Sequence, residues 1–161
     1  MSPASLVAEE KALNVILKAE TWTASTKLYL GLSSLKPSEL LKKTTAKEFG
    51  EKEPEEAHSW RRVEISGSEK PGWEVTKGEA ETGFTKYVNK NAIKTGTEAW
   101  EFAKLTSGVT EIKLETFAIC EKLKASEAGN ILVSGKLTTP ITINSVSTIE
   151  IAAKELVIEC E

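Results

Sequence analysis

His58 is the only histidine of the chain and therefore its main candidate for proton transfer near neutral pH. It follows Glu53, Glu55 and Glu56, which could act as carboxylate partners or as oxygen ligands for a metal ion. A catalytic triad needs a preorganised setting, but residues 47–58 are strongly acidic and have no apolar period. We therefore expect residues 47–58 to form an exposed loop and His58 to be a solvated loop residue.

The chain contains no aspartate, which argues against both metal and hydrolase chemistry. Calcium loops space short Asp or Asn ligands around a glycine, and most two-carboxylate hydrolases and metal-dependent phosphoryl-transfer sites use at least one aspartate. The sequence also lacks the glycine-rich phosphate loops, the C-x-x-C pair and the G-x-S-x-G nucleophile motif. It thus predicts no catalytic residue, no metal site and no cofactor.

Four tryptophans could form a platform for a sugar or a protein partner, since flat rings stack on apolar faces and anchor interfaces. They are Trp22, Trp60, Trp73 and Trp100. Packing in the core or at a sheet edge is the plainer interpretation, and we favour it.

Arg61 and Arg62 are adjacent in a strand-like run, so their side chains should point to opposite faces, which argues against a phosphate clamp. We expect one of them to form an ion pair with another subunit. Cys120 and Cys160 also lie in strand-like runs, where a thiol usually behaves as a small buried apolar group. A disulfide between them is the less favoured alternative.

Length and composition favour one globular domain over residues 1–161. The chain is 40% hydrophobic and 28% charged, and a chain of this length buries roughly 70% of its unfolded surface without a metal or a disulfide. The formal net charge of −3 comes from interspersed acidic and basic residues, which argues against a nucleic-acid partner. No apolar stretch approaches the ~20 residues that span a bilayer, and no secretory pattern opens the chain, so we expect synthesis in the cytoplasm and no membrane partner.

Residues 1–20 have the pattern of an amphipathic α-helix. Ser2 and Pro3 suit its first positions, and apolar residues then recur at helical spacing on one stripe, namely Leu6, Leu13, Ile16 and Leu17. Two positions for this stripe are open. We favour cover of an edge or end of the chain's own sheet, and docking on a neighbouring subunit is the alternative.

Residues 27–161 have the pattern of an antiparallel, jelly-roll-like β-sandwich, so the predicted fold class is mainly β with one N-terminal helix. From residue 27 the apolar period changes to two, with Leu28, Leu30 and Leu32 on one face, which predicts a strand with one buried face. The C-terminal third consists of short β-branched runs separated by turn signals at 129–130, 139–140 and 144–145. These gaps are too short for the helical crossovers of a parallel sheet.

Five short segments follow one another along the chain: KLYLGLS at 27–33, SWRRV at 59–63, NKNAI at 89–93, TFAICE at 116–121 and GNILVSGKLTTP at 129–140. In type and order they resemble a family of small tailed-bacteriophage virion proteins, described either as tail-fibre-like or as head-decoration proteins. The resemblance covers most of the chain and rests on turn and strand signatures. Glu121 stands where the family usually has aspartate, Thr116 where it has histidine, and residues 94–111 read as an insertion, so these departures affect local geometry more than fold.

The resemblance implies a non-enzymatic structural protein of the virion. Its leading interpretation is a capsid decoration or cement protein on the head surface, assembled as a homo-oligomer and bound to the major capsid protein or other virion proteins. The alternative is a tail-associated, fibre-like protein that takes part in host recognition. Repetition of a modest interface around a lattice gains avidity, so neither role requires a reactive site.

Partner contacts are expected in two places. The first is the helical stripe of Leu6, Leu13, Ile16 and Leu17, and the second is the acidic segment 47–58 with the tryptophan that follows it, represented by Glu53, Glu55, Glu56 and Trp60. Strand edges that need cover also favour a homo-oligomer.

Overall fold

The computed structural model describes residues 4–19, 21, 27–66, 71–77, 85–96, 101–127 and 129–160, and the fold is mainly β with an N-terminal helix, as predicted. The helical elements are α1 (Leu6–Lys18), α2 (Ala46–Gly50) and the short 3₁₀ turn η1 (Glu56–His58). The strands are β1 (Tyr29–Ser33), β2 (Val63–Glu64), β3 (Trp73–Lys77), β4 (Thr85–Asn89), β5 (Ile93–Gly96), β6 (Phe102–Ala103), β7 (Ile112–Cys120), β8 (Ile131–Ile143), β9 (Glu150–Ile151) and β10 (Val157–Cys160).

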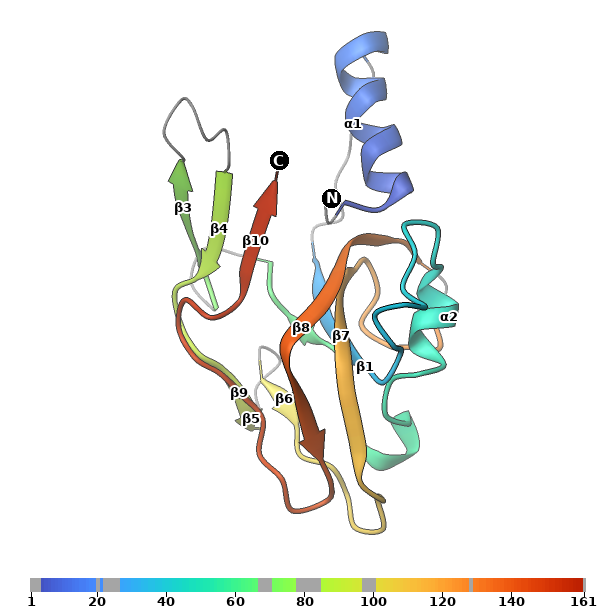
Figure 1. The fold of residues 1–161 in the computed structure, drawn as a ribbon, viewed down its shortest axis with the longest axis vertical. Helices are drawn as coiled ribbons and strands as arrows, with labels where there is room; N and C mark the ends of the chain where they lie inside the picture. Colours follow the sequence, from blue (N-terminus) through green and yellow to red (C-terminus); the bar gives the residue numbers. More distant parts are fainter. Residues whose placement is uncertain are drawn as a thin grey trace.

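Three sheets form the β part of the molecule (Figure 1). The largest has the order β2-β1-β7-β8 and lies beside α2, whereas the sheets β10-β4-β3 and β6-β5-β9 lie on its other side. Between the described strands all pairings are antiparallel except that of β5 with β6. The predicted antiparallel, sandwich-like fold is therefore confirmed in its main features, and its jelly-roll connectivity stays a prediction.

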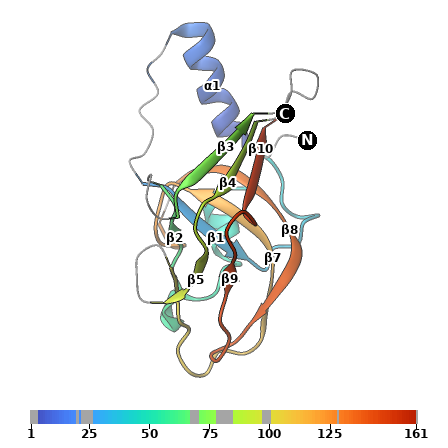
Figure 2. The same ribbon diagram turned by 90° about the vertical axis from the view of Figure 1, so that its left-hand side faces the viewer.

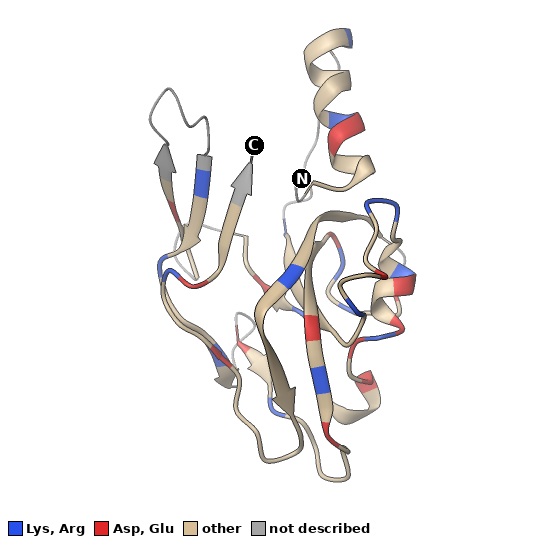
Figure 3. Ribbon diagram, viewed as in Figure 1, with Lys and Arg blue, Asp and Glu red and all other residues tan. Residues whose placement is uncertain are grey.

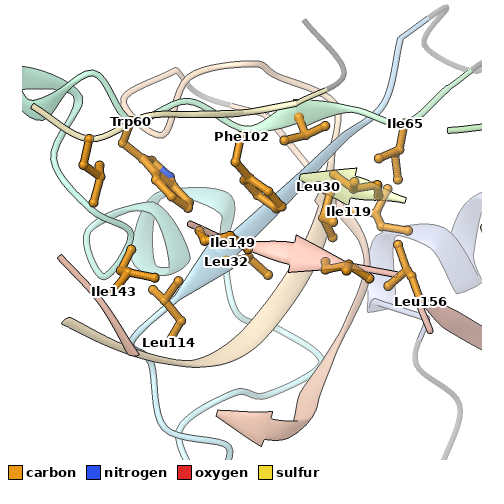
Figure 4. Close-up of a cluster of buried hydrophobic side chains, with 14 residues drawn as sticks. Leu30, Leu32, Trp60, Ile65, Phe102, Leu114, Ile119, Ile143, Ile149 and Leu156 are labelled. Carbon is orange, nitrogen blue, oxygen red and sulfur yellow. The ribbon is translucent and has the colours of Figure 1, made fainter. Parts of the chain in front are cut away.

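The main hydrophobic core lies between the largest sheet and the other two (Figure 4). Leu30 and Leu32, which the alternation placed on one face of the first strand, are fully buried in it. Trp60 and Phe102 stack across the core from them, with ring centroids 5.6 Å apart. Stacked aromatic pairs stabilise a core beyond the area they bury, so Trp60 is a core residue.

Strand β1 is buried on both faces, which corrects the prediction of a single buried face. Behind it, α2 packs Ala46 and Phe49 into a second apolar cluster. A capping box starts α2: the Thr45 hydroxyl accepts from the Glu48 N–H, and the Glu48 carboxylate accepts from the Thr45 N–H. The exposed loop predicted at 47–58 is therefore wrong for its first half, because one Ala and one Phe are too few for periodicity to reveal a helix.

Strand β8 runs unbroken through Pro140, so the turn predicted at 139–140 is wrong. Because β8 is the edge strand of its sheet, and its pairing with β7 shifts register near this point, a residue without an N–H group is accommodated. Gly135 earlier in β8 permits a close approach of the Phe117 ring to the backbone. A Cβ added there would lie 2.8 Å from Cε1 of Phe117.

Helix α1 follows the N-cap residue Ser5 and is shorter than the helix predicted over 1–20. Ser2 and Pro3, expected as its first residues, lie outside the described residues. No described helix is long and apolar enough to cross a membrane. The extension of one domain over 1–161 stays a prediction.

Candidate partner-binding surface

Helix α1 is joined to the body of the protein at its N-terminal end. The Ser5 N–H donates to the Leu132 carbonyl at 2.9 Å, and the Ser5 hydroxyl donates to the Ile131 carbonyl, both in β8. The same hydroxyl accepts from the Ala8 N–H and so caps the helix. One serine therefore starts the helix and ties it to the sheet.

Two ion pairs orient α1. Lys11 Nζ lies 3.1 Å from Glu121 Oε1, at the end of β7, and Glu9 pairs with Lys42 at the base of the helix. Partial burial would raise the pKa of Glu121, but hydrogen bonds from Asn130 and Lys11 outweigh burial and lower it. Glu121 is therefore charged at neutral pH and holds Lys11 toward the body.

The apolar stripe of α1 is exposed. Leu6 and Leu13 are about half exposed, and Ile16 and Leu17 are 74% and 75% exposed. At 3.6 residues per turn, Leu13, Ile16 and Leu17 lie on the side of the helix roughly opposite Lys11. Figures 1 and 2 both show α1 projecting from one end of the body. The alternative in which the stripe covers the chain's own sheet is therefore wrong.

The second predicted contact region contains a buried ion pair. Glu53 is 7% exposed and Arg62 is fully buried. The Arg62 guanidinium donates from Nε to both Glu53 oxygens at 2.9 and 3.2 Å and from one terminal nitrogen at 2.6 Å, and its other terminal nitrogen donates to the Lys122 carbonyl at 3.1 Å. Gly31 of β1 leaves room for the pair, because an added Cβ would lie 2.5 Å from Oε1 of Glu53. Glu53 therefore offers no side chain to a partner.

Arg62 pairs within its own chain, so the inter-subunit ion pair expected for one of the two arginines is wrong for this one. Burial alone would lower the pKa of Arg62, but the hydrogen bonds and charge of Glu53 raise it overall. Burial raises the pKa of Glu53, and the hydrogen bonds and charge of Arg62 oppose that effect. With three hydrogen bonds from Arg62, the carboxylate is the form of Glu53 that this geometry accommodates.

Glu55, Glu56 and His58 lie nearer the surface and have local partners. Glu55 Oε2 is 3.8 Å from His58 Nε2. The Glu56 carboxylate accepts from the Ser126 N–H and hydroxyl at 3.1 and 2.8 Å, and these hydrogen bonds lower its pKa. Among the described residues, no group of three or more His, Cys, Asp or Glu side chains could hold a metal ion. Glu55 and Glu56 stay predicted partner contacts.

The tryptophans of the described segments do not form a platform. Trp60 is buried and stacked, so it too offers no side chain to a partner. Trp73 donates its indole N–H to the Ile65 carbonyl at 2.8 Å and packs against the core. Trp22 and Trp100 lie outside the described residues.

Cys120 is a free, buried thiol, as the sequence predicted, and the alternative of a disulfide is wrong. Burial raises its pKa to about 12, although the neighbouring Arg62 opposes this. The thiolate is the reactive form of cysteine, so Cys120 is inert at neutral pH.

An apolar groove that the sequence did not indicate lies at the end of the molecule that carries α1. Its volume is about 290 Å³ and its lining is apolar apart from one serine; the apolar residues are Leu28, Ile65, Trp73, Tyr87, Ile119 and Ile158. These residues come from segments far apart in the chain. No local period joins them, and only the fold brings them together.

One protein family matches nearly the whole chain. Residues 3–159 match the model of the family described as Podophage GP4 fiber I protein gp80. The chain belongs to this family. No curated protein matches it.

Membership of this fibre protein family confirms the resemblance to phage virion proteins of tail-fibre-like type. It indicates a structural protein of the virion, associated with other virion components. In the view of Figure 3, α1, α2 and β7 each carry both basic and acidic residues. Apolar contacts at the α1 end therefore remain the main candidate for assembly.

Proposed function

We propose that this chain is a non-enzymatic structural component of a podophage tail fibre, and that it assembles through the end of the molecule that carries α1. The family description, which names a fibre protein, supports the fibre part of the proposal. The observation that carries the assembly part is the exposed stripe of α1, where Ile16 and Leu17 are 74% and 75% exposed. Contiguous exposed apolar surface of this kind marks interaction sites in soluble proteins.

The surroundings of the potentially reactive side chains Cys120, Arg62 and His58 agree with a structural role. The Cys120 thiol is buried and has a pKa of about 12. The fully buried guanidinium of Arg62 is paired with Glu53 and also donates to a backbone carbonyl. His58 has a glutamate neighbour 3.8 Å away in a partly exposed turn, which is not the rigid setting that acid–base catalysis needs.

The family description favours the tail-associated alternative over the capsid decoration that the sequence placed first. Decoration of the head stays the second candidate, because the resemblance described above includes head-decoration proteins. Host recognition by the fibre would require surface residues, and Glu55 and Glu56 are available for it.

Labelling of intact virions tests the location. Antibodies raised against the purified chain, followed by cryo-electron microscopy, should mark the tail of the phage that encodes it. Particles of a phage mutant that lacks the chain serve as the control and should carry no label. Label distributed over the capsid capsomers, with none at the tail, would overturn the fibre proposal in favour of head decoration.

A further inference from the structure

The C-terminal end of helix α1 projects from the body of the protein (Figures 1 and 2). The residues from Val15 to Lys18 are all exposed, and because four residues complete a turn, the helix is accessible on every side there. No residue of α1 is buried, and neither apolar cluster of the described residues includes one. In the part of the chain that the structure describes, apolar packing therefore does not fix the direction of α1.

The N-terminal end of α1 is attached through the backbone. Besides the two hydrogen bonds of Ser5 to β8, the Leu6 N–H donates to the Lys42 carbonyl at 3.2 Å, and Ala4 forms an antiparallel bridge with Val133. Ser5 is only 4% exposed. These contacts join uncharged groups, so salt does not screen them as it screens pairs of exposed charges. Ser5 is thus a fixed point of the helix.

Beyond Ser5, two ion pairs join α1 to the body. Lys11 Nζ lies 3.1 Å from Glu121 Oε1, and Glu9 pairs with Lys42. The lysine side chains of these pairs are 32% and 37% exposed. Pairs that water reaches are weak and are screened by salt. The direction of α1 therefore depends on contacts that are much easier to break than a packed core.

We infer that α1 is an arm that can turn about Ser5, and that the ion pairs of Lys11 with Glu121 and of Glu9 with Lys42 set its direction. When both pairs are removed or screened, the intact helix leaves its position on the body and carries its apolar stripe with it. Ionic strength thus controls the direction in which the stripe is presented.

Only the use of this motion in assembly rests on the proposed function. The motion itself belongs to the isolated chain, and it is the same whether the chain sits in a tail fibre or on a head. Failure of the labelling experiment and failure of this inference are therefore separate results.

Distances between two spin labels, measured by pulsed electron paramagnetic resonance, test the motion. One label is placed at the projecting end of the helix in Lys18→Cys and the other in Val146→Cys, because Val146 is 81% exposed in the turn after β8 at the other end of the molecule (Figure 1). Cys160→Ser removes one native thiol, and Cys120, buried with a pKa of about 12, does not react with the label.

The labelled chain should give one narrow distance distribution at about 0.01 M salt, where the Debye length is about 30 Å. Glu121→Gln/Lys42→Met should broaden it. Exposed pairs shift an equilibrium about 1.5- to 5-fold each, so loss of both should raise the ratio of turned to docked helices about 2- to 25-fold. Both changes lie in the body, so α1 keeps its own sequence.

The matched control is Lys27→Met/Glu115→Gln. It removes the same two kinds of charge from the pairs of Lys27 with Glu64 and of Lys113 with Glu115, 2.9 and 3.2 Å apart, neither of which involves α1. The control should keep the narrow distribution at low salt. At about 1 M salt the Debye length is about 3 Å, and the chain with both α1 ion pairs intact should approach the broad distribution.

Two results would overturn the inference. One is a Glu121→Gln/Lys42→Met distribution as narrow as that of the control, and the other is a distribution already broad at low salt with both ion pairs intact. NMR chemical shifts distinguish turning from melting, since a helix of 13 residues is marginal by itself in water. The Cα shifts of residues 6–18 should stay helical in Glu121→Gln/Lys42→Met, because the Ser5 cap is retained. Loss of helical shifts would mean that the ion pairs hold the helix together, and it too would overturn the inference.

Discussion

Loss of the Arg62 guanidinium should destabilise the protein strongly, because Arg62→Met leaves Glu53 buried without its counter-ion. Arg62 is fully buried, Glu53 is 7% exposed, and the hydrogen bonds that join them span 2.6 to 3.2 Å. Removal of one partner of a buried pair costs about 3–5 kcal/mol, out of the ~5–15 kcal/mol by which a domain is usually stable. At about 2–4 °C per kcal/mol for a domain of this size, the unfolding midpoint should fall by about 6–20 °C.

The loss should be smaller in mild acid than at neutral pH. Burial raises the pKa of Glu53 even with Arg62 present, and the pKa should rise further in Arg62→Met because the main opposing group is gone. A carboxyl whose pKa is higher in the folded than in the unfolded state binds its proton more tightly when folded, so the variant should regain stability as pH falls toward the ordinary value of 4.5. Thermal unfolding followed by tryptophan fluorescence, at about pH 7 and about pH 5, measures both effects.

Two further variants make this prediction specific. Replacement of the whole pair in Arg62→Met/Glu53→Leu should recover most of the loss, since an apolar pair of similar volume leaves no buried charge. Lys27→Met removes a cation from the exposed pair with Glu64, 2.9 Å apart, and should leave the midpoint close to that of wild type. An Arg62→Met midpoint as high as that of Lys27→Met, or a double variant no more stable than the single one, would refute the reasoning.

Three further predictions concern the same core and the base of α1. Gly31→Ala should cost about 1–3 kcal/mol in a urea titration, because the added Cβ would lie 2.5 Å from Oε1 of Glu53. Phe102→Ala should cost about 3–5 kcal/mol and change the emission of Trp60, because the fully buried Phe102 ring stacks on that indole; an unchanged emission spectrum would contradict the stacking. The free energy of unfolding should fall as pH drops below 4.5. Hydrogen bonds lower the pKa of Glu121 despite its partial burial, so the folded state binds a proton at Glu121 less tightly than the unfolded state. In thermal unfolding at a series of pH values, Glu121→Gln should show a smaller fall than wild type.

The strands were predictable where an alternating pattern is local and one side of it is apolar. Leu30 and Leu32 are core residues for the reason that the alternation gives: they lie on the same face of β1. The same alternation placed Gly31 on the opposite, unburied face, and this was wrong because that face of β1 is buried as well. Its burial depends on Arg62, which is distant in the sequence.

Glu53 could not be placed from its surroundings in the sequence. It lies among charged residues that are mostly exposed, and nothing in the segment distinguishes it from Glu55. What distinguishes Glu53 from Glu55 is its ion pair with Arg62, nine residues further on. The pair lies beside Gly31 of β1 and Phe49 of α2. A buried ion pair looks like two surface charges until the fold brings its members together.

Helix α1 shows a different limit: its helical period was recognised, but the favoured position of its apolar stripe, on the chain's own sheet, was wrong. Amphipathic spacing predicts that one face is buried, and the chain's own sheet and another molecule satisfy it equally. The contact that decides joins Lys11 to Glu121 across 110 residues of sequence, so no local period contains it. Exposure of Ile16 and Leu17 forgoes about 1.5–3 kcal/mol for each side chain relative to full burial. Polar residues of equal helix propensity would serve the folded monomer as well, and for this reason we propose that the apolar face of α1 is a contact for assembly.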